Sequence, residues 1–425
     1  MECRNSSLCV FDKQHTQTDV IRSYVSDYYP ITSITSNGPI EFHVPGNTED
    51  YVDVNDVYLH VKFKVTKADG TAIDAADKVG LNNLAIATLF QDVSLTLGEI
   101  QIEGGQQSYP YLAYFPTIMQ MHPAAQKSHM KLFGWSKDEA DKMDDEANKG
   151  FVERQKWTAG GKICELYGPL YLDFMRQSRH LISQTDMRLR LLPHKPEFVL
   201  NAYGTNDFKI TFQTVTLHVR RIVLNPSVIN GHAVGLNKQN AIYPVNHTQL
   251  INFTIPSGQK SYIKDRLFPL QAPKLLVVGM VENDAFNGNI KKNPFNFQHF
   301  DLNKIALYRE GESIPGRPFT PDFTEGHYAR SYAHLMQTFH YLNADDTNAL
   351  TYDEFGKGYT LYAYDLTADN DISSEYRHAI SNNNLRLELA FKTNLSKTIN
   401  VLLYAVFDSH VEITKLRDVL TSYTR

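Results

Sequence analysis

The sequence predicts an all-β protein made of two β-sandwiches in tandem. Three observations support this prediction: many short segments alternate between apolar and polar residues, most are bounded by Gly, Pro, Asn or Asp, and Tyr and Phe are abundant. The 24 Tyr and 23 Phe among 425 residues favour strands because these side chains fit pleated surfaces. Hydrophobic residues make up 42% of the chain and charged residues 21%, so a large core can form and bulk disorder is disfavoured.

In the first half, residues 1–36 are polar with scattered tyrosines, and we interpret them as an N-terminal arm outside the core. The first clear strand is residues 57–65, where every second residue from Val57 to Val65 is apolar and the residues between them are Tyr, His or Lys. This period of two is typical of a half-buried antiparallel strand. Shorter segments bounded by turn residues predict further strands at 93–97, 170–174, 187–191 and 215–219.

The second half repeats this pattern. Residues 274–281 form a near-continuous apolar run, which predicts a strand buried on both faces. Similar segments predict strands at 304–308, 385–391, 401–407 and 411–413. Because the strands do not alternate with regular helices, a sandwich or barrel is favoured over a parallel sheet with crossover helices.

Two segments predict helices inserted between strands. Residues 111–121 are apolar, and residues 326–342 place Tyr328, Tyr332 and Leu335 three or four positions apart, the spacing of one helix face. The acidic residues between 138 and 146 are interpreted as the solvated face of a helix or as an exposed insertion.

A Gly- and Asn-rich break divides the strands into two sets of similar size. Each set is large enough for an eight-stranded jelly roll, so the predicted architecture is a double jelly roll, two tandem eight-stranded jelly rolls with helical insertions. It comprises an N-terminal arm at 1–36, a first jelly roll at 37–225, a linker at 226–239, a second jelly roll at 240–415 and a C-terminal tail at 416–425.

Composition excludes several classes of function. The net charge is −5, whereas a surface that coats nucleic acid needs a basic excess, so no direct nucleic-acid site is expected. Cys3, Cys9 and Cys164 have neither disulfide-framework nor metal-ligand spacing. An apolar N-terminal region and a run of about 18 apolar residues are both missing, so we expect no signal peptide, no membrane-spanning segment and synthesis in the cytosol.

Motifs that carry covalent chemistry are also missing from the sequence. Gly161-Lys162 lacks the other residues of a phosphate-binding loop, and neither a Gly-x-Ser-x-Gly elbow nor a His-Glu-x-x-His zinc helix occurs. The 16 histidines include no His-x-His pair of the kind that binds metal in jelly-roll enzymes. The acidic stretch 345–354 lacks the Gly and Glu of a calcium loop, so a solvated loop is favoured. We therefore expect a protein that is not an enzyme, with no cofactor and no metal site.

Several segments carry a resemblance to a known family. Residues 278–288 (Val-Gly-Met-Val-Glu-Asn-Asp-Ala-Phe-Asn-Gly) and 291–297 (Lys-Lys-Asn-Pro-Phe-Asn-Phe) resemble the signature segment of Polinton/Maverick-type, adintovirus-like major capsid proteins. Further segments are similar to the same family, in the same order along the chain, at 38–42 with 49–53, 108–114, 168–174 and 303–308.

The resemblance implies a structural role. Proteins of this family form homotrimeric capsomers with a pseudo-hexagonal outline, because three chains with two jelly rolls each mimic six subunits. The implied location is the virion capsid of an icosahedral virus or a virus-like transposon shell, after synthesis in the host cell cytoplasm. The implied partners are other copies of the chain, neighbouring capsomers, and penton or minor capsid proteins.

Phe295, Phe297 and Phe319 are the candidate inter-subunit contacts. For Phe295 and Phe297 a position in the core of one chain is the alternative, since both follow Pro294 at the start of a predicted strand. The alternative function is a jelly-roll carbohydrate- or receptor-binding module, for which the loop 343–357 supplies Asn and Asp residues.

Overall fold

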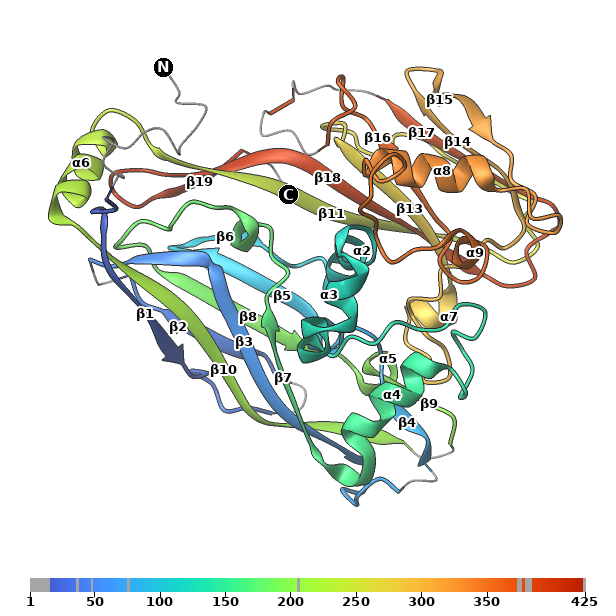
Figure 1. Ribbon diagram of the computed structural model, residues 1–425, viewed down its shortest axis with the longest axis horizontal. Helices are drawn as coiled ribbons and strands as arrows, with labels where there is room; N and C mark the ends of the chain where they lie inside the picture. Colours follow the sequence, from blue (N-terminus) through green and yellow to red (C-terminus); the bar gives the residue numbers. More distant parts are fainter. Residues whose placement is uncertain are drawn as a thin grey trace, which may run out of the picture.

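Two β-sandwiches lie side by side in the computed structural model, with several of the helices between them (Figure 1). The structure describes residues 16–35, 38–46, 49–74, 77–204, 207–372, 377–378 and 384–422. Each sandwich consists of two sheets whose neighbouring strands are all antiparallel; three of these four sheets have four strands and one has five.

The first sandwich comes from the N-terminal half of the chain. One sheet, called the β1 sheet, has the order β1 (Val20–Tyr28), β10 (Phe208–Leu224), β3 (Tyr51–Lys67), β7 (Ile163–Pro169). The other has the order β2 (Ile40–Val44), β8 (Met187–Pro193), β5 (Phe90–Leu97), β6 (Ile100–Glu103). The short strands β4 (Val79–Leu81) and β9 (Leu200–Ala202) form a separate pair.

The second sandwich comes from the C-terminal half. Its β11 sheet has the order β11 (Ala241–Ile255), β18 (Ile399–Ile413), β13 (Leu275–Glu282), β16 (Leu361–Asp365), and β19 (Val419–Thr421) pairs with β18. The facing sheet has the order β12 (Ser261–Lys264), β17 (Leu385–Phe391), β14 (Leu302–Arg309), β15 (Glu312–Phe319).

The chain builds both sandwiches in the same order. Leaving aside the separate β4–β9 pair and β19, the first, eighth, third and sixth strands of each half form one sheet, and the second, seventh, fourth and fifth form the other. Strand pairs among the described residues stay within 20–224 or within 241–421. The predicted all-β fold with two jelly rolls is confirmed.

Helices occupy the connections between strands. We call residues 104–162, between β6 and β7, the first insertion, and residues 320–360, between β15 and β16, the second insertion. The first contains α2 (Tyr109–Gln120), α3 (Pro123–Lys127), η3 (His129–Phe133), α4 (Lys149–Thr158) and η4 (Ala159–Gly161), and the second contains α8 (Ala329–Thr338) and α9 (Tyr352–Phe355). The remaining helices are α1 (Ala85–Thr88), η5 (Phe174–Arg176), α5 (Pro196–Val199), α6 (Pro226–Leu236) and α7 (Asn283–Phe286).

Three segments predicted to lie outside the jelly rolls contain regular structure. The predicted arm, of which residues 1–15 and 36 lie outside the described residues, includes β1, the strand that completes the first sandwich. The predicted linker 226–239 holds α6, where the side chain of Asn225 accepts a hydrogen bond from the amide of Ser227. The predicted tail 416–425 contributes β19, although its last residues, 423–425, are not among those described.

Two strand predictions differ from the structure, one in the extent of the strand and one in its existence. The segments 401–407 and 411–413 belong to one continuous strand, β18. Residues 170–174 do not form a strand. Their amides bind side chains instead of a neighbouring strand: the carboxylate of Glu103 accepts hydrogen bonds from the amides of Asp173 and Phe174 at 2.7 and 2.5 Å.

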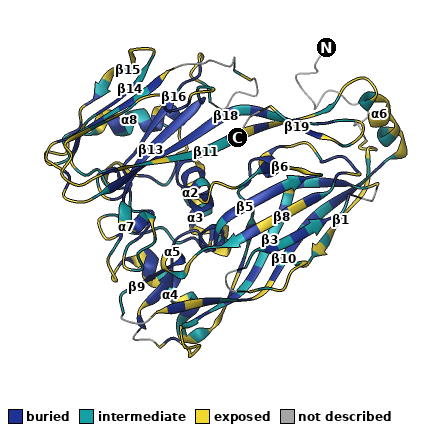
Figure 2. Ribbon diagram, turned by 180° about the vertical axis from the view of Figure 1, so that it is seen from behind, coloured by how far each residue is buried: buried dark blue, intermediate teal, exposed yellow. Residues whose placement is uncertain are grey.

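Burial differs between the two halves (Figure 2). Along β3 the residues from Val57 to Val65 alternate between buried and half-buried positions, as the sequence predicts. All eight residues of β13 and the first nine of β18 are buried, which confirms the prediction of a strand with two covered faces at 274–281. Among the described residues, no helix is long and apolar enough to span a membrane.

Candidate functional site

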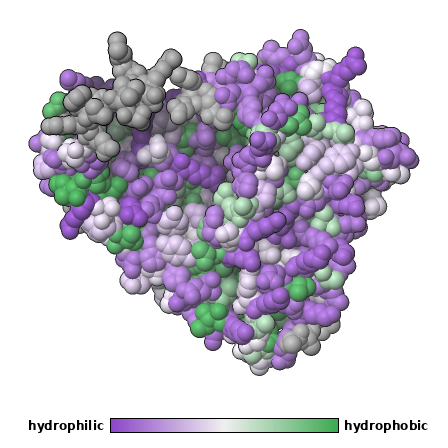
Figure 3. All heavy atoms as spheres, viewed as in Figure 1, coloured by the Kyte–Doolittle hydropathy of each residue, from purple (hydrophilic) through white to green (hydrophobic). Residues whose placement is uncertain are grey.

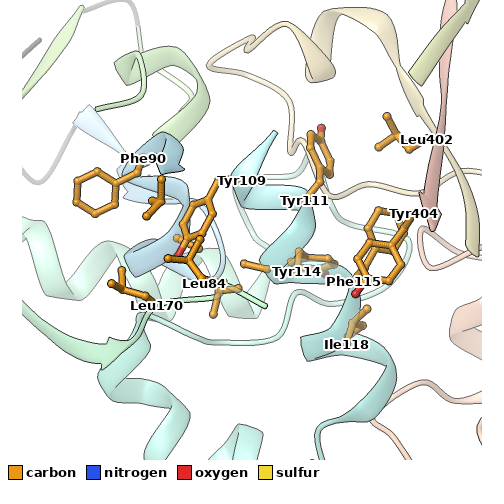
Figure 4. Packing of buried hydrophobic residues seen from close by; sticks show 14 of the residues in the cluster. Leu84, Phe90, Tyr109, Tyr111, Tyr114, Phe115, Ile118, Leu170, Leu402 and Tyr404 are labelled. Carbon is orange, nitrogen blue, oxygen red and sulfur yellow. The ribbon is translucent and has the colours of Figure 1, made fainter. Parts of the chain in front are cut away.

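The joint between the two sandwiches is formed largely by the first insertion. In α2, the residues Tyr111, Tyr114, Phe115 and Ile118 repeat at intervals of three and four, which places them on one helix face. Ten of the twelve residues of α2 are buried, because the helix packs against its own sandwich and against the second one. Figure 4 shows Phe115 beside Tyr404 of β18, with the two ring centroids 5.3 Å apart.

Phe295 and Phe297 belong to this joint. The ring of Phe295 stacks on Tyr114 at 4.0 Å and meets Tyr111 edge-on at 5.5 Å, and the ring of Phe297 lies 5.3 Å from Phe115. Both side chains are fully buried within the single chain. Their placement matches the alternative of a position in the core of one chain. It does not fit an inter-subunit contact, because neither ring is exposed on the surface.

Phe319 lies elsewhere, at the end of β15. Its ring packs among His334, Tyr362 and Tyr364 and is only 2% exposed. The guanidinium of Arg330 covers it at 4.9 Å from the centroid. The structure thus does not bring Phe319 together with Phe295 and Phe297, and the small exposed area leaves little for a direct subunit contact.

A buried polar network fixes the joint. Arg154 of α4 donates a hydrogen bond to Asp138 at 2.7 Å, and both side chains are 1% exposed. The other carboxylate oxygen of Asp138 accepts a hydrogen bond from the side chain of Asn293 in the second half, at 2.9 Å. Arg154 also donates to the carbonyls of Leu81 and Ser136, so the buried cation has three hydrogen-bond partners, and Asp138 connects it to the second half.

The prediction that the acidic residues 138–146 form a solvated face was wrong for Asp138 and Asp144. The carboxylate of Asp144 accepts hydrogen bonds from the amide of Asn293 at 2.6 Å and from the side chain of Asn296 at 2.9 Å. Burial raises the pKa of Asp144. These carboxylates accept hydrogen bonds from the Asn-Pro-Phe-Asn-Phe segment. Sequence spacing could not reveal this role, because the partners lie about 150 positions apart.

Two carboxyl groups, those of Glu103 and Asp173, lie close together near α2. Asp173 accepts hydrogen bonds from the amide and hydroxyl of Thr248 in β11 at 2.7 and 2.8 Å, which links the two halves. Glu103 and Asp173 line a cavity of about 280 Å³ together with His247. Burial and the neighbouring Asp173 raise the pKa of Glu103, and burial raises that of Asp173 against the nearby Arg176.

The arrangement is suited to holding two bodies together. The described residues contain no group of three or more His, Cys, Asp or Glu side chains placed to hold a metal ion. Asp345 and Asp346 are exposed, as expected of a solvated loop. On the face shown in Figure 3, hydrophobic residues are scattered among hydrophilic ones, a normal distribution for a protein surface.

Comparisons with known proteins bear on the fold. No protein-family model matches the chain. An uncharacterized protein of Caenorhabditis elegans is 24% identical over 406 residues, which cover 90% of this chain and 93% of that protein.

Three solved structures share the fold. The chain matches a structure of the Sputnik virophage with a TM-score of 0.67 and 13% identity, covering 99% of this chain and 92% of that one. It matches the PBCV-1 virus capsid with a TM-score of 0.61 and 12% identity, covering 98% of this chain and 100% of that one. It matches the mavirus major capsid protein with a TM-score of 0.56 and 11% identity, covering 97% of this chain and 93% of that one. At these identities the likeness shows a shared double jelly-roll fold.

Proposed function

We propose that this chain is a major capsid protein that forms homotrimeric capsomers of an icosahedral shell. The observation that carries the proposal is the repeated strand order, which gives one chain two equivalent eight-stranded sandwiches. Three such chains supply six similar bodies, and a closed ring of six bodies tiles a shell by edge contacts. Closed rotational symmetry is also the usual way in which protein chains cover surfaces that a single chain leaves open.

The solved structures that share the fold support this proposal, since they include the PBCV-1 virus capsid and the mavirus major capsid protein. We further propose a Polinton/Maverick-type, adintovirus-like origin. The signature-like segments 278–288 and 291–297 support it, and a relative in a nematode is what we expect if genes of this kind reside in animal genomes.

In this role the protein acts by geometry and binding energy, without covalent chemistry. Its partners would be further copies of itself, then neighbouring capsomers and penton or minor capsid proteins, and its location would be the virion capsid after synthesis in the host cytoplasm. The buried joint supports this proposal because it fixes the angle between the two sandwiches, on which the outline of a capsomer depends.

The test is the mass of the purified protein, measured by light scattering behind a sizing column. A mass of three chains that persists on dilution is the expected result, and electron microscopy would then look for shells. A single-chain mass at micromolar concentration would count heavily against the proposal.

A carbohydrate- or receptor-binding module is the second candidate. One observation favours it: Tyr352, within the loop 343–357, is 38% exposed and stacks on Tyr328 at 4.8 Å, and exposed aromatic rings can serve as platforms for sugars. A glycan array probed with the monomeric protein would test it, and an array without hits would reject it.

A further inference from the structure

The two sandwiches differ in what covers their equivalent sheets. The β1 sheet and the β11 sheet have the same strand order and occupy the same position in the chain path. In the β11 sheet, β13 and the first nine residues of β18 are buried on both faces. In the β1 sheet, the equivalent strands β3 and β10 alternate between buried and more exposed residues over most of their length. One sheet therefore has a covered outer face, and the other has an open one.

The outer face of the β11 sheet is covered partly by the first insertion, which belongs to the other sandwich, and partly by Phe297 of its own half. Helix α2 of the first insertion places Phe115 against Tyr404 of β18, and Phe297, packed on Phe115, lies against Gly279 of β13. The contact is thus made by the insertion of one sandwich on the outer face of the next sandwich's sheet.

The open face of the β1 sheet carries an aromatic patch, which we call the Tyr–His patch and define as Tyr58, His60, Tyr167 and His218. Tyr58 stacks on Tyr167 at 5.4 Å, and the ring of His218 lies 5.5 Å from Tyr167 and 5.9 Å from His60. The side chains of His60 and His218 are 25% and 21% exposed.

Carboxylates hold the two histidines of the patch. His60 Nε2 lies 2.7 Å from Glu165, and His218 Nδ1 lies 2.7 Å from Asp27. A single cross-strand pair of rings is enough to stabilise neighbouring strands. The patch is larger than such a pair, since its four rings come from three adjacent strands. Pre-arranged aromatic side chains with a polar rim are typical of the centre of a protein interface.

The second insertion has the complementary property. Helix α2 is buried almost all round, whereas α8 buries only Ser331, Leu335, Met336 and Thr338 and leaves its other face open. Ala329, Arg330 and Gln337 are exposed there. The guanidinium of Arg330 lies on this open side, where it donates hydrogen bonds to the carbonyls of Arg317 and Pro318.

We propose that the Tyr–His patch is covered by the second insertion, residues 320–360, of another copy of this chain. This contact repeats between chains the one that the first insertion makes within the chain. It rests on the proposed trimeric capsomer and assigns the surfaces that would form it. Each chain has one open sheet and one open insertion, so the contacts are head-to-tail, and they close into a ring of three when neighbouring chains are related by one third of a turn.

The first test is site-specific photocrosslinking of the full chain. Tyr167 is replaced by the photoreactive residue benzoylphenylalanine, and Tyr262 of β12, which stacks on Phe253 at 5.2 Å, is replaced in a matched control. After irradiation, the Tyr167 variant should give a product of two chains joined within residues 320–360, and the control should not join to that segment. If a preparation with a three-chain mass gives no such product, or gives one joined elsewhere, the proposal is overturned.

The second test compares two double variants by light scattering on dilution. Tyr58→Ala/Tyr167→Ala removes both rings of a stacked pair in the patch, and Phe253→Ala/Tyr262→Ala removes a stacked pair on the second sandwich. The patch variant should dissociate at a concentration about tenfold higher or more than the unaltered protein, the effect of losing interface tyrosines, and the control should not. Equal behaviour of the two variants would overturn the proposal.

These results separate the inference from the proposed function. A three-chain mass that survives both patch substitutions would leave the capsomer standing and reject the assigned surface. A single-chain mass for the unaltered protein would reject both.

Discussion

Removing the guanidinium of Arg154 should destabilise the protein strongly. In Arg154→Leu, the carboxylate of Asp138 stays buried and loses its cation, and the carbonyls of Leu81 and Ser136 lose a donor. Breaking a buried ion pair by removing one partner costs about 3–5 kcal/mol, because the remaining charge is left uncompensated. We expect the free energy of unfolding to fall by this amount.

Urea-induced unfolding followed by tryptophan fluorescence suits the measurement. Trp135 is fully buried and precedes Ser136, and Trp157 lies in α4 close to Arg154, so the signal reports on the joint. With a slope of roughly 3 kcal/mol per molar urea, the loss shifts the midpoint by about 1–2 M.

Two further variants sharpen the result. Arg154→Leu/Asp138→Asn should recover part of the loss, because the neutral amide no longer leaves a charge buried. Arg190→Leu is the matched control: Arg190 pairs with Glu41 at 3.5 Å on the surface, with side chains 51% and 36% exposed, and such pairs contribute about 0–1 kcal/mol. A loss for Arg154→Leu no larger than that of the control would refute the reasoning.

Three other perturbations test different parts of the structure. Burial and a neighbouring carboxylate raise the pKa of Glu103 to about 8. A carboxyl group whose pKa is raised on folding contributes stability that is lost as the pH rises through the folded value, so the free energy of unfolding should fall between pH 5 and 8. The fall should be smaller in Glu103→Gln, and an unchanged slope in that variant would contradict this origin. A methyl group on Gly279 would lie 2.7 Å from Phe297, so Gly279→Ala should cost about 1–3 kcal/mol in urea unfolding, whereas Gly235→Ala, in the open on α6, should be neutral or slightly stabilising. Phe295→Ala should cost about 3–5 kcal/mol as a core substitution, and a loss that varied with protein concentration would instead indicate a subunit contact.

The fold could be predicted from the sequence where burial has a period. The alternation at 57–65 and the apolar run at 274–281 each mark a strand, because the side chains of a strand point to opposite faces and the pattern records which faces are covered. Strand β1 escaped prediction for the same reason. It is an edge strand whose residues are exposed or half-buried, so neither face imposes a clear pattern.

The joint was harder to predict because its partners are far apart in the chain. Asp138 and Asp144 looked like solvated acids, since nothing near them in the sequence indicates that Arg154 and Asn293 enclose them. A weak signal existed for α6: Asn225 followed by Pro226 is a typical helix start. The face of the β1 sheet could be predicted to be polar but not to gather rings from three strands, which depends on register.

The two-sided burial of β13 and β18 has a consequence for synthesis on the ribosome. Part of the cover of these strands is α2, which leaves the exit tunnel before they do, since chains emerge from the N-terminus at about 5–20 residues per second. The first sandwich can therefore fold early and present a finished template of aromatic rings when the later strands arrive. The apolar strands β13 and β18 thus find part of their cover already synthesised when they emerge.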